Sequence, residues 1–138
     1  MQGFEQVVKG KTMEKATRMN QHDSLQKITE LVLTFRDQRD WRQFHSIRNL
    51  YIALTGEIGE LGSLFQWVPD TDLDQWLLEG KNKERVSDEL ADVFAYLLLL
   101  AKTLDIDLGE ALDAKVKKNG NKYPVDKSKG VSTKYSEL

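Results

Sequence analysis

Gly56-Glu57-Ile58-Gly59-Glu60-Leu61 and Asp88-Glu89-Leu90-Ala91-Asp92-Val93 are the two stretches around which the chain is organised. Each stretch places two acids three residues apart inside an apolar helical pattern. Residues three apart lie on the same face of a helix, with their Cβ atoms close together. The sequence therefore predicts two long helices, each with a pair of carboxylates on one face.

Both acidic pairs lie on or beside the apolar stripe of their helix. Glu57 and Glu89 fall within the stripes, and Glu60 and Asp92 border them. The apolar residues are Leu50, Leu54, Leu61 and Leu64 in the first stripe, and Val86, Val93, Tyr96 and Leu100 in the second. Because apolar stripes face the core, we expect four carboxylates to point inward from two helices that pack face to face.

Inward carboxylates need a compensating cation, because an unpaired buried charge is costly. No Lys or Arg shares these faces, so a bound metal ion is favoured over the alternative, acids that merely face solvent. Neither histidine, His22 or His45, follows a helical Glu by three residues as in di-iron bundles. There is no cysteine. An all-oxygen site for Mg²⁺, with Mn²⁺ as a possible substitute, is predicted.

Composition narrows the function classes. A length of 138 residues suits one domain with a core of its own, and a net charge of -2 argues against an electrostatic nucleic-acid binder. The lack of cysteine fits a reducing cytoplasm, which is the location we expect. The N-terminus has no apolar signal-peptide core. The longest apolar run, Val93–Ala101, is too short to span a bilayer.

Helical periodicity and capping residues predict an all-α four-helix bundle with flexible tails. Plausible N-caps are Asp23 or Ser24, Ser46 and Asp107. The four helices are expected at about residues 24–39, 47–67, 82–104 and 107–118, with a polar loop or short helix over 69–82 and a break at Gly120. The expected organisation is a polar N-terminal tail over 1–22, the helical bundle over 23–118 and a basic C-terminal tail over 119–138.

The partner that suits such a metal is a nucleotide polyphosphate. Mg²⁺ usually shares its coordination with phosphate oxygens. Seven lysines lie from Lys115 onward, against Asp126 and Glu137. The connector from Trp41 to His45 supplies aromatic rings for stacking.

On these features the chain resembles the all-α nucleotide pyrophosphohydrolases of the MazG-like superfamily, and within it the dCTP pyrophosphatases. The resemblance covers about residues 25–124. It is carried by Arg39-Asp40-Trp41-x-x-Phe44-His45, Arg48-Asn49-Leu50, the first acidic stretch, Leu64-Phe65-Gln66-Trp67, the second acidic stretch, Tyr96-Leu97, and Lys115-x-x-x-Asn119-x-x-Lys122-Tyr123-Pro124. Gly56 stands where many members of the superfamily have another Glu. The dCTP-type group tends to lack that acid, so Gly56 supports the resemblance to this group.

The resemblance implies a fold, a reaction and a set of residue roles. The fold would be that of the all-α NTP pyrophosphatases. The reaction would be hydrolysis of dCTP, or modified dCTP, to dCMP and pyrophosphate in nucleotide-pool house-cleaning. Glu57, Glu60, Glu89 and Asp92 would hold Mg²⁺, one Glu would serve as base, and the base pocket would consist of Trp41, His45, Trp67 and Tyr96. The phosphates would contact Lys115, Asn119, Lys122 and Tyr123. Arg48 and Asn49 are weaker candidates for the same role.

Two alternatives stay open. One is a pyrophosphatase of broader or dUTP-type specificity, and the other is a non-catalytic helical bundle with a structural ion site. Gly56 and Gly59 interrupt a helix at about 1 kcal/mol each relative to Ala, which favours either close approach of a ligand or backbone, or tight helix packing. The apolar helix over 82–104 should leave a large exposed patch on a monomer. The resemblance implies a homotetramer, a dimer of dimers, with active sites near subunit interfaces.

Overall fold

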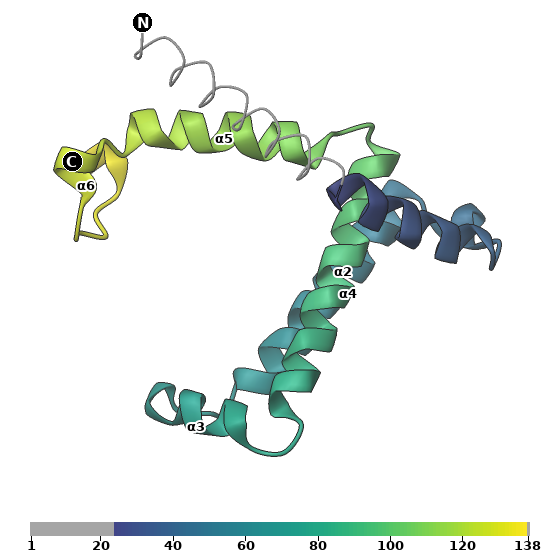
Figure 1. The fold of residues 1–138 in the computed structure, drawn as a ribbon, viewed down its shortest axis with the longest axis horizontal. Coiled ribbons are helices and arrows are strands. Elements are labelled where there is room, and N and C mark those ends of the chain that lie inside the picture. Colours follow the sequence, from purple (N-terminus) through teal and green to yellow (C-terminus); the bar gives the residue numbers. More distant parts are fainter. Residues whose placement is uncertain (1–23, 138) are drawn as a thin grey trace, which may run out of the picture. The chain divides into compact units, whose positions relative to one another are not determined.

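A computed structural model describes residues 24–137 of the chain (Figure 1). Every regular element in this range is a helix, so the all-α prediction is confirmed. The first helix is described over residues 24–37. The elements that follow are η1 (Trp41–Phe44), α2 (Ile47–Phe65), η2 (Asp70–Asp72), α3 (Leu73–Leu78), α4 (Asn82–Thr103), α5 (Leu108–Lys122), α6 (Val125–Ser128) and η3 (Tyr135–Glu137). The four long helices that the sequence predicts are all present. No helix in the described range is both long and apolar enough to cross a membrane.

The starts of two helices follow from their capping residues. The Ser46 hydroxyl accepts a hydrogen bond from the Asn49 backbone N–H at 3.2 Å and begins α2. An Asp107 carboxylate oxygen accepts one from the Glu110 N–H at 2.9 Å and begins α5. Each cap satisfies a backbone donor that the first turn of a helix leaves unpaired. Both predicted caps are confirmed. For the first helix the predicted caps are Asp23 or Ser24, and Asp23 lies outside the described residues.

Two helix ends differ from the prediction. The first helix ends at residue 37 rather than 39, and Asp40 adopts a left-handed φ of 54° that an α-helix cannot contain. By contrast, α5 continues through Gly120 to Lys122, where an end at Lys118 was expected. One glycine costs a helix only about 1 kcal/mol, which the further hydrogen bonds of the last turn offset. The end is closed by the Tyr123 N–H, which donates to the Asn119 carbonyl at 2.8 Å.

The helices α2 and α4 pack along each other and form the main body of residues 24–105 (Figure 1). Their buried apolar residues are Leu50 near the start of α2 and Leu98, Leu99 and Ala101 near the end of α4. The start of one helix therefore faces the end of the other, and the two run antiparallel. This packing sets the registers of Glu57 and Glu89 against each other near the middle of the pair.

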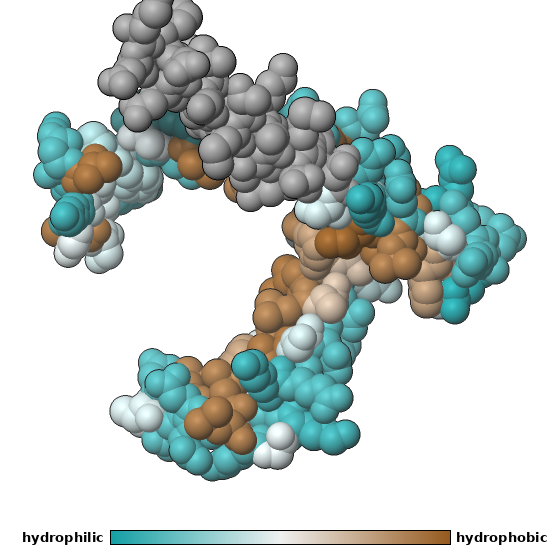
Figure 2. All heavy atoms as spheres, viewed as in Figure 1, coloured by the Kyte–Doolittle hydropathy of each residue, from teal (hydrophilic) through white to brown (hydrophobic). Residues whose placement is uncertain are grey.

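Many apolar side chains of this pair stay exposed (Figure 2). On α4 they include Leu90, Phe94 and Leu97, and on α2 Ile52 and Ile58. The expectation that the apolar helix leaves a patch uncovered in a single chain is thus confirmed. At the other end of α2, Phe65 meets Trp76 of α3 edge to face, with ring centroids 5.9 Å apart.

The chain divides into two compact units between Asp105 and Ile106. The second unit contains α5, α6 and η3. Within it, the Tyr123 and Tyr135 rings meet edge to face at 5.8 Å, and the Lys122 Nζ lies 4.8 Å from the Tyr135 ring centre. The tail–bundle–tail organisation over 1–22, 23–118 and 119–138 stays a prediction, and its first segment lies outside the described residues.

Candidate metal centre

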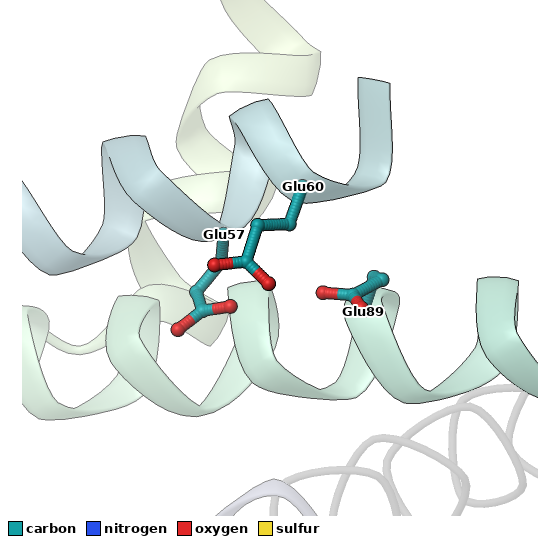
Figure 3. Close-up of side chains that lie close together, drawn as sticks. All are labelled: Glu57, Glu60 and Glu89. Carbon is teal, nitrogen blue, oxygen red and sulfur yellow. The ribbon is translucent and has the colours of Figure 1, made fainter. Parts of the chain in front are cut away.

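Three carboxylates meet between α2 and α4 (Figure 3). Glu57 and Glu60 lie one turn apart on α2, and Glu89 reaches them from α4. One carboxylate oxygen from each residue lies within 4.8 Å of the other two. We call these three residues the acidic cluster. Its geometry follows from the i, i+3 spacing on α2 and from the antiparallel register of the two helices.

Electrostatic repulsion within the acidic cluster is reflected in Glu57. Burial raises the pKa of Glu57 above its ordinary value, and the charges of Glu60, Asp92 and Glu89 raise the pKa further. Glu57 and Glu89 are half-buried, whereas Glu60 is exposed. Within residues 24–137, no Lys or Arg forms an ion pair with any of the three. The cluster therefore concentrates negative charge without a compensating side chain.

Asp92 lies beside the acidic cluster rather than in it. It follows Glu89 by three residues on α4 and is exposed, and it is not among the three residues whose oxygens meet. Its charge nevertheless reaches Glu57 and contributes to the raised pKa. The predicted set of four thus divides into three carboxylates in contact range and a fourth that adds to their field.

The donor chemistry of the cluster fits Mg²⁺. All the donors are carboxylate oxygens, which hard divalent cations prefer, and no histidine is among them. A cation would also relieve the repulsion that raises the pKa of Glu57. Exposed Glu60 and Asp92 leave one side of the cluster open to a further ligand.

The predicted aromatic residues occupy several places in the first unit. Trp67 follows α2 and is 84% exposed. Tyr96 follows Asp92 by four residues on α4 and is partly buried. Trp41 in η1 packs edge to face on Phe35, with centroids 5.9 Å apart. Glu57 lies ten residues into α2, so the connector is separated from the acidic cluster by roughly 15 Å along that helix.

His45 lines a cavity of about 400 Å³ together with Leu33, Arg36, Arg42, Lys102 and Thr103. None of the four predicted metal-binding acids lines this cavity. Burial lowers the pKa of His45, and the charge of Arg36 lowers the pKa further. The His45 Nδ1 atom is buried and has no hydrogen-bond partner within the described part of the chain. Sequence reasoning did not single out Arg36, since an arginine in a polar stretch carries no signal of burial.

The weaker candidates, Arg48 and Asn49, lie in the first turn of α2 and are exposed. The Asn49 side-chain amide donates to the Phe44 carbonyl at 2.9 Å. This bond holds the end of η1 against the start of α2, which gives Asn49 a structural task.

Three of the predicted phosphate-side residues share one face of α5. Lys115, Asn119 and Lys122 are spaced by four and three residues, which keeps them on the same side of the helix, and Tyr123 is the residue that follows its last turn. Lys122 and Tyr123 both contact Tyr135 of η3. Tyr135 is a neighbour that the sequence reasoning missed, because it lies in a polar segment with no periodic pattern to place it.

The glycines beside the acids have open space around them. A Cβ built on Gly56 or Gly59 meets no other described atom within 4 Å. Tight packing within residues 24–105 therefore does not account for these two glycines, which favours close approach of a ligand or of another backbone.

Comparison with known proteins identifies the family to which the chain belongs. The MazG-like family model matches residues 52–138. The chain is 40% identical over 121 residues to dCTP pyrophosphatase 1 of Mus musculus, covering 88% of this chain and 71% of that protein. It is 39% identical over 115 residues to dCTP pyrophosphatase 1 of Homo sapiens, covering 83% and 68%.

A solved structure agrees with these matches. The crystal structure of a pyrophosphatase from Archaeoglobus fulgidus superposes with a TM-score of 0.67 at 36% identity, covering 73% of this chain and 93% of that chain. The resemblance read from the sequence motifs is confirmed, and with it the all-α pyrophosphatase fold. The acidic cluster on α2 and α4 is accordingly a feature of a chain that belongs to the MazG-like family.

Proposed function

We propose that the protein is a Mg²⁺-dependent nucleoside triphosphate pyrophosphohydrolase that converts dCTP, or modified dCTP, and water to dCMP and pyrophosphate. The observation that carries this proposal is the acidic cluster, three carboxylates whose oxygens lie within 4.8 Å of one another and that form no ion pair with a Lys or Arg of residues 24–137. The similarity to dCTP pyrophosphatase 1 supports the choice of substrate.

The acids of α2 and α4 would hold the metal. Glu57, Glu60 and Glu89 supply the central donors, and Asp92 adds charge or a further donor from the open side. When bound, Mg²⁺ would neutralise charge on phosphate oxygens and lower the pKa of a coordinated water. Mn²⁺ suits the same donors.

The reaction itself requires a general base, which accepts a proton from water, and residues that position the phosphates. One Glu of the acidic cluster accepts the proton of the water that attacks the α-phosphorus, with pyrophosphate as the leaving group. The phosphates would be bound by Lys115, Asn119 and Lys122 on one face of α5 and by Tyr123 just after it, since ammonium, amide and hydroxyl donors suit phosphate oxygens. Arg48, exposed in the first turn of α2, is a weaker candidate for the same task.

The nucleobase of the substrate would be recognised by Trp41, His45, Trp67 and Tyr96. Stacking on aromatic rings tolerates any base, so hydrogen bonds to the Watson–Crick edge must select cytosine. The exposure of Trp67, 84%, is unusual for a tryptophan and leaves its ring free for stacking.

The working form would be a homotetramer, built as a dimer of dimers, in the cytoplasm. Exposed apolar residues along α2 and α4 and the open space around Gly56 and Gly59 support association with further copies. In such an assembly, the connector of one chain would lie near the acidic cluster of another chain, and the two would together form one active site. We expect neither nucleic acid nor membrane among the partners.

The test is a substrate panel with product analysis. Purified protein with Mg²⁺ is offered dCTP, modified dCTP, dUTP and the other deoxynucleoside triphosphates. Preferential release of pyrophosphate from dCTP supports the proposal. Equal rates across the panel, or preference for dUTP, replace it with an enzyme of broader or dUTP-type specificity. If no nucleotide releases pyrophosphate, the proposal is replaced by the non-catalytic alternative, a helical bundle with a structural ion site.

A further inference from the structure

A second charged site lies at one end of the α2–α4 pair, away from the acidic cluster. It is a half-open cavity of about 400 Å³ lined by Leu33, Arg36, Arg42, His45, Lys102 and Thr103, which come from the first helix, η1 and the residue after it, and the end of α4. Lys102 follows Glu89 by thirteen residues on α4, which corresponds to roughly 20 Å along the helix. The volume is in the lower part of the range of about 300–1,000 Å³ for small-molecule sites. We call it the cationic cavity.

Arg36 is the unusual residue of this cavity because its side chain is only 10% exposed. Its Nε donates to one carboxylate oxygen of Asp37 at 2.7 Å, and its NH2 lies 2.6 Å from the same oxygen. A guanidinium carries five N–H donors in a fixed fork. The contacts of Arg36 with Asp37 use only its Nε and one terminal nitrogen, so within residues 24–137 further N–H groups of Arg36 have no protein acceptor and are available to a ligand.

The other two cations of the cavity have no acidic partner in the described part of the chain. Neither Arg42 nor Lys102 forms an ion pair there. The Thr103 hydroxyl already donates to the Leu99 carbonyl at 2.8 Å, so the three cations are the donors available to a ligand. With Asp37 as the one carboxylate in contact with them, three positive charges face one negative charge.

The helix dipoles oppose an anion here but are weaker than the side chains. The first helix and α4 both end near the cavity, and a helix C-terminus carries roughly half a negative charge. Arg39 reduces this at the first helix by donating to the Phe35 carbonyl at 2.9 Å. The excess of cationic side chains therefore determines the sign of the potential in the cavity.

We propose that the cationic cavity binds an anion of the phosphate class, separately from the acidic cluster. Two arginine forks and one ammonium group suit the several acceptor oxygens of phosphate. Orthophosphate, pyrophosphate and the phosphates of a nucleotide present the same chemistry. The cationic cavity shares no acid with the acidic cluster, but it shares His45 with the proposed nucleobase pocket.

The experiment uses the full-length protein in EDTA, where the acidic cluster repels anions. Orthophosphate, pyrophosphate and dCTP are titrated separately by isothermal calorimetry. Removing two charge-assisted contacts in Arg42→Gln/Lys102→Gln should weaken binding by at least about tenfold. The charge-matched control is Lys127→Gln/Lys129→Gln, two exposed lysines without a proposed role, and it should bind as wild type does. A second variant, Lys115→Gln/Lys122→Gln, removes the proposed phosphate-side lysines and shows whether the anion binds there instead. Binding of the free anions supports the proposal. Binding of dCTP alone contradicts it, because Trp41 and His45 belong to the proposed nucleobase pocket.

A local readout is available because the chain has only two histidines, His22 and His45. The imidazole signals of His45 in a nuclear magnetic resonance spectrum are assigned by their loss in His45→Gln. Pyrophosphate should shift the His45 signals but not those of His22, and sodium chloride of equal ionic strength should not. The proposal is overturned by an absence of binding in EDTA, by binding that Arg42→Gln/Lys102→Gln leaves intact, or by binding that is lost only in Lys115→Gln/Lys122→Gln.

Discussion

At the scale of single residues, Glu57 links the charge of the site to the stability of the fold. Its pKa is raised above the ordinary value of 4.5 by burial and by neighbouring acids. A raised pKa in the folded state gives stability that is fully present below the unfolded value and is lost as pH rises through the folded value. We therefore expect the metal-free protein to lose stability, relative to Glu57→Gln, as pH rises from 4.5 toward neutrality.

This pH dependence is measured by thermal melts of both proteins in EDTA over that range. The difference between wild type and Glu57→Gln isolates the glutamate, because all other titrating groups are common to both. A difference that stays constant as pH rises would show that Glu57 ionises without penalty, as a solvated acid does, and would contradict the raised pKa.

Glu89 provides a second residue-scale prediction. Glu89→Gln keeps the shape of the side chain and removes one of the like charges near Glu57. The metal-free variant should melt at a higher temperature than wild type. Wild type should gain about 1 kcal/mol from Mg²⁺ a few-fold above its dissociation constant, and the variant should gain less.

The matched control is Asp88→Asn, an exposed neighbour on α4 outside the acidic cluster. It should change stability by no more than about 0.5 kcal/mol and keep the full Mg²⁺ gain. If instead Glu89→Gln melts lower without metal and keeps the whole Mg²⁺ gain, Glu89 is not a metal ligand.

At the scale of elements, the connector η1 carries the proposed base recognition. Trp41→Ala and His45→Ala should weaken nucleotide binding and leave Mg²⁺ binding intact, since neither residue belongs to the acidic cluster. Trp41 also packs on Phe35, so its loss removes some packing. Phe44→Ala, an exposed residue of the same element, is the control and should keep nucleotide affinity.

Calorimetric titrations with Mg²⁺ and with a nonhydrolysable dCTP analogue separate the two affinities. The assignment of the connector to the base is wrong if either variant loses Mg²⁺ affinity while its affinity for the nucleotide is unchanged.

Helix positions were predictable from the sequence because they depend on local chemistry. Ser46 and Asp107 are caps whose hydrogen bonds span three residues, and the apolar stripes put Glu57 and Glu89 on the faces that meet. The end of α5 was not predictable in the same way, because the penalty of Gly120 is small enough for the helix to continue.

The membership of the site was harder to predict than its location. Periodicity defines the face of a helix but not how far a side chain reaches, so it does not distinguish Asp92 from the three acids whose oxygens meet, and the role of Asp92 as a fourth metal ligand stays a prediction. The burial of Arg36 depends on how three elements come together around the cationic cavity, which no local pattern encodes. The contact of Tyr135 with Lys122 likewise joins segments without a shared period.

At the scale of the whole molecule, the exposed apolar surface predicts self-association. Light scattering at micromolar concentration should give the mass of a tetramer. A variant of α2 tests where the copies meet. Gly59→Leu places a side chain in the open space beside Gly59. If another chain packs at this position, the variant should have a lower mass than wild type. A monomeric mass for wild type would contradict the proposed assembly.

The central claim is hydrolysis at the α-phosphorus of dCTP in a site built on the acidic cluster. It is tested most directly by turnover with Mg²⁺ in water enriched in oxygen-18, followed by mass analysis of the products. Attack at the α-phosphorus predicts dCMP that carries the heavy oxygen, together with unlabelled pyrophosphate, and no turnover by Glu89→Gln. Label in the pyrophosphate, or formation of dCDP and orthophosphate, would place the reaction at another phosphorus and contradict the account.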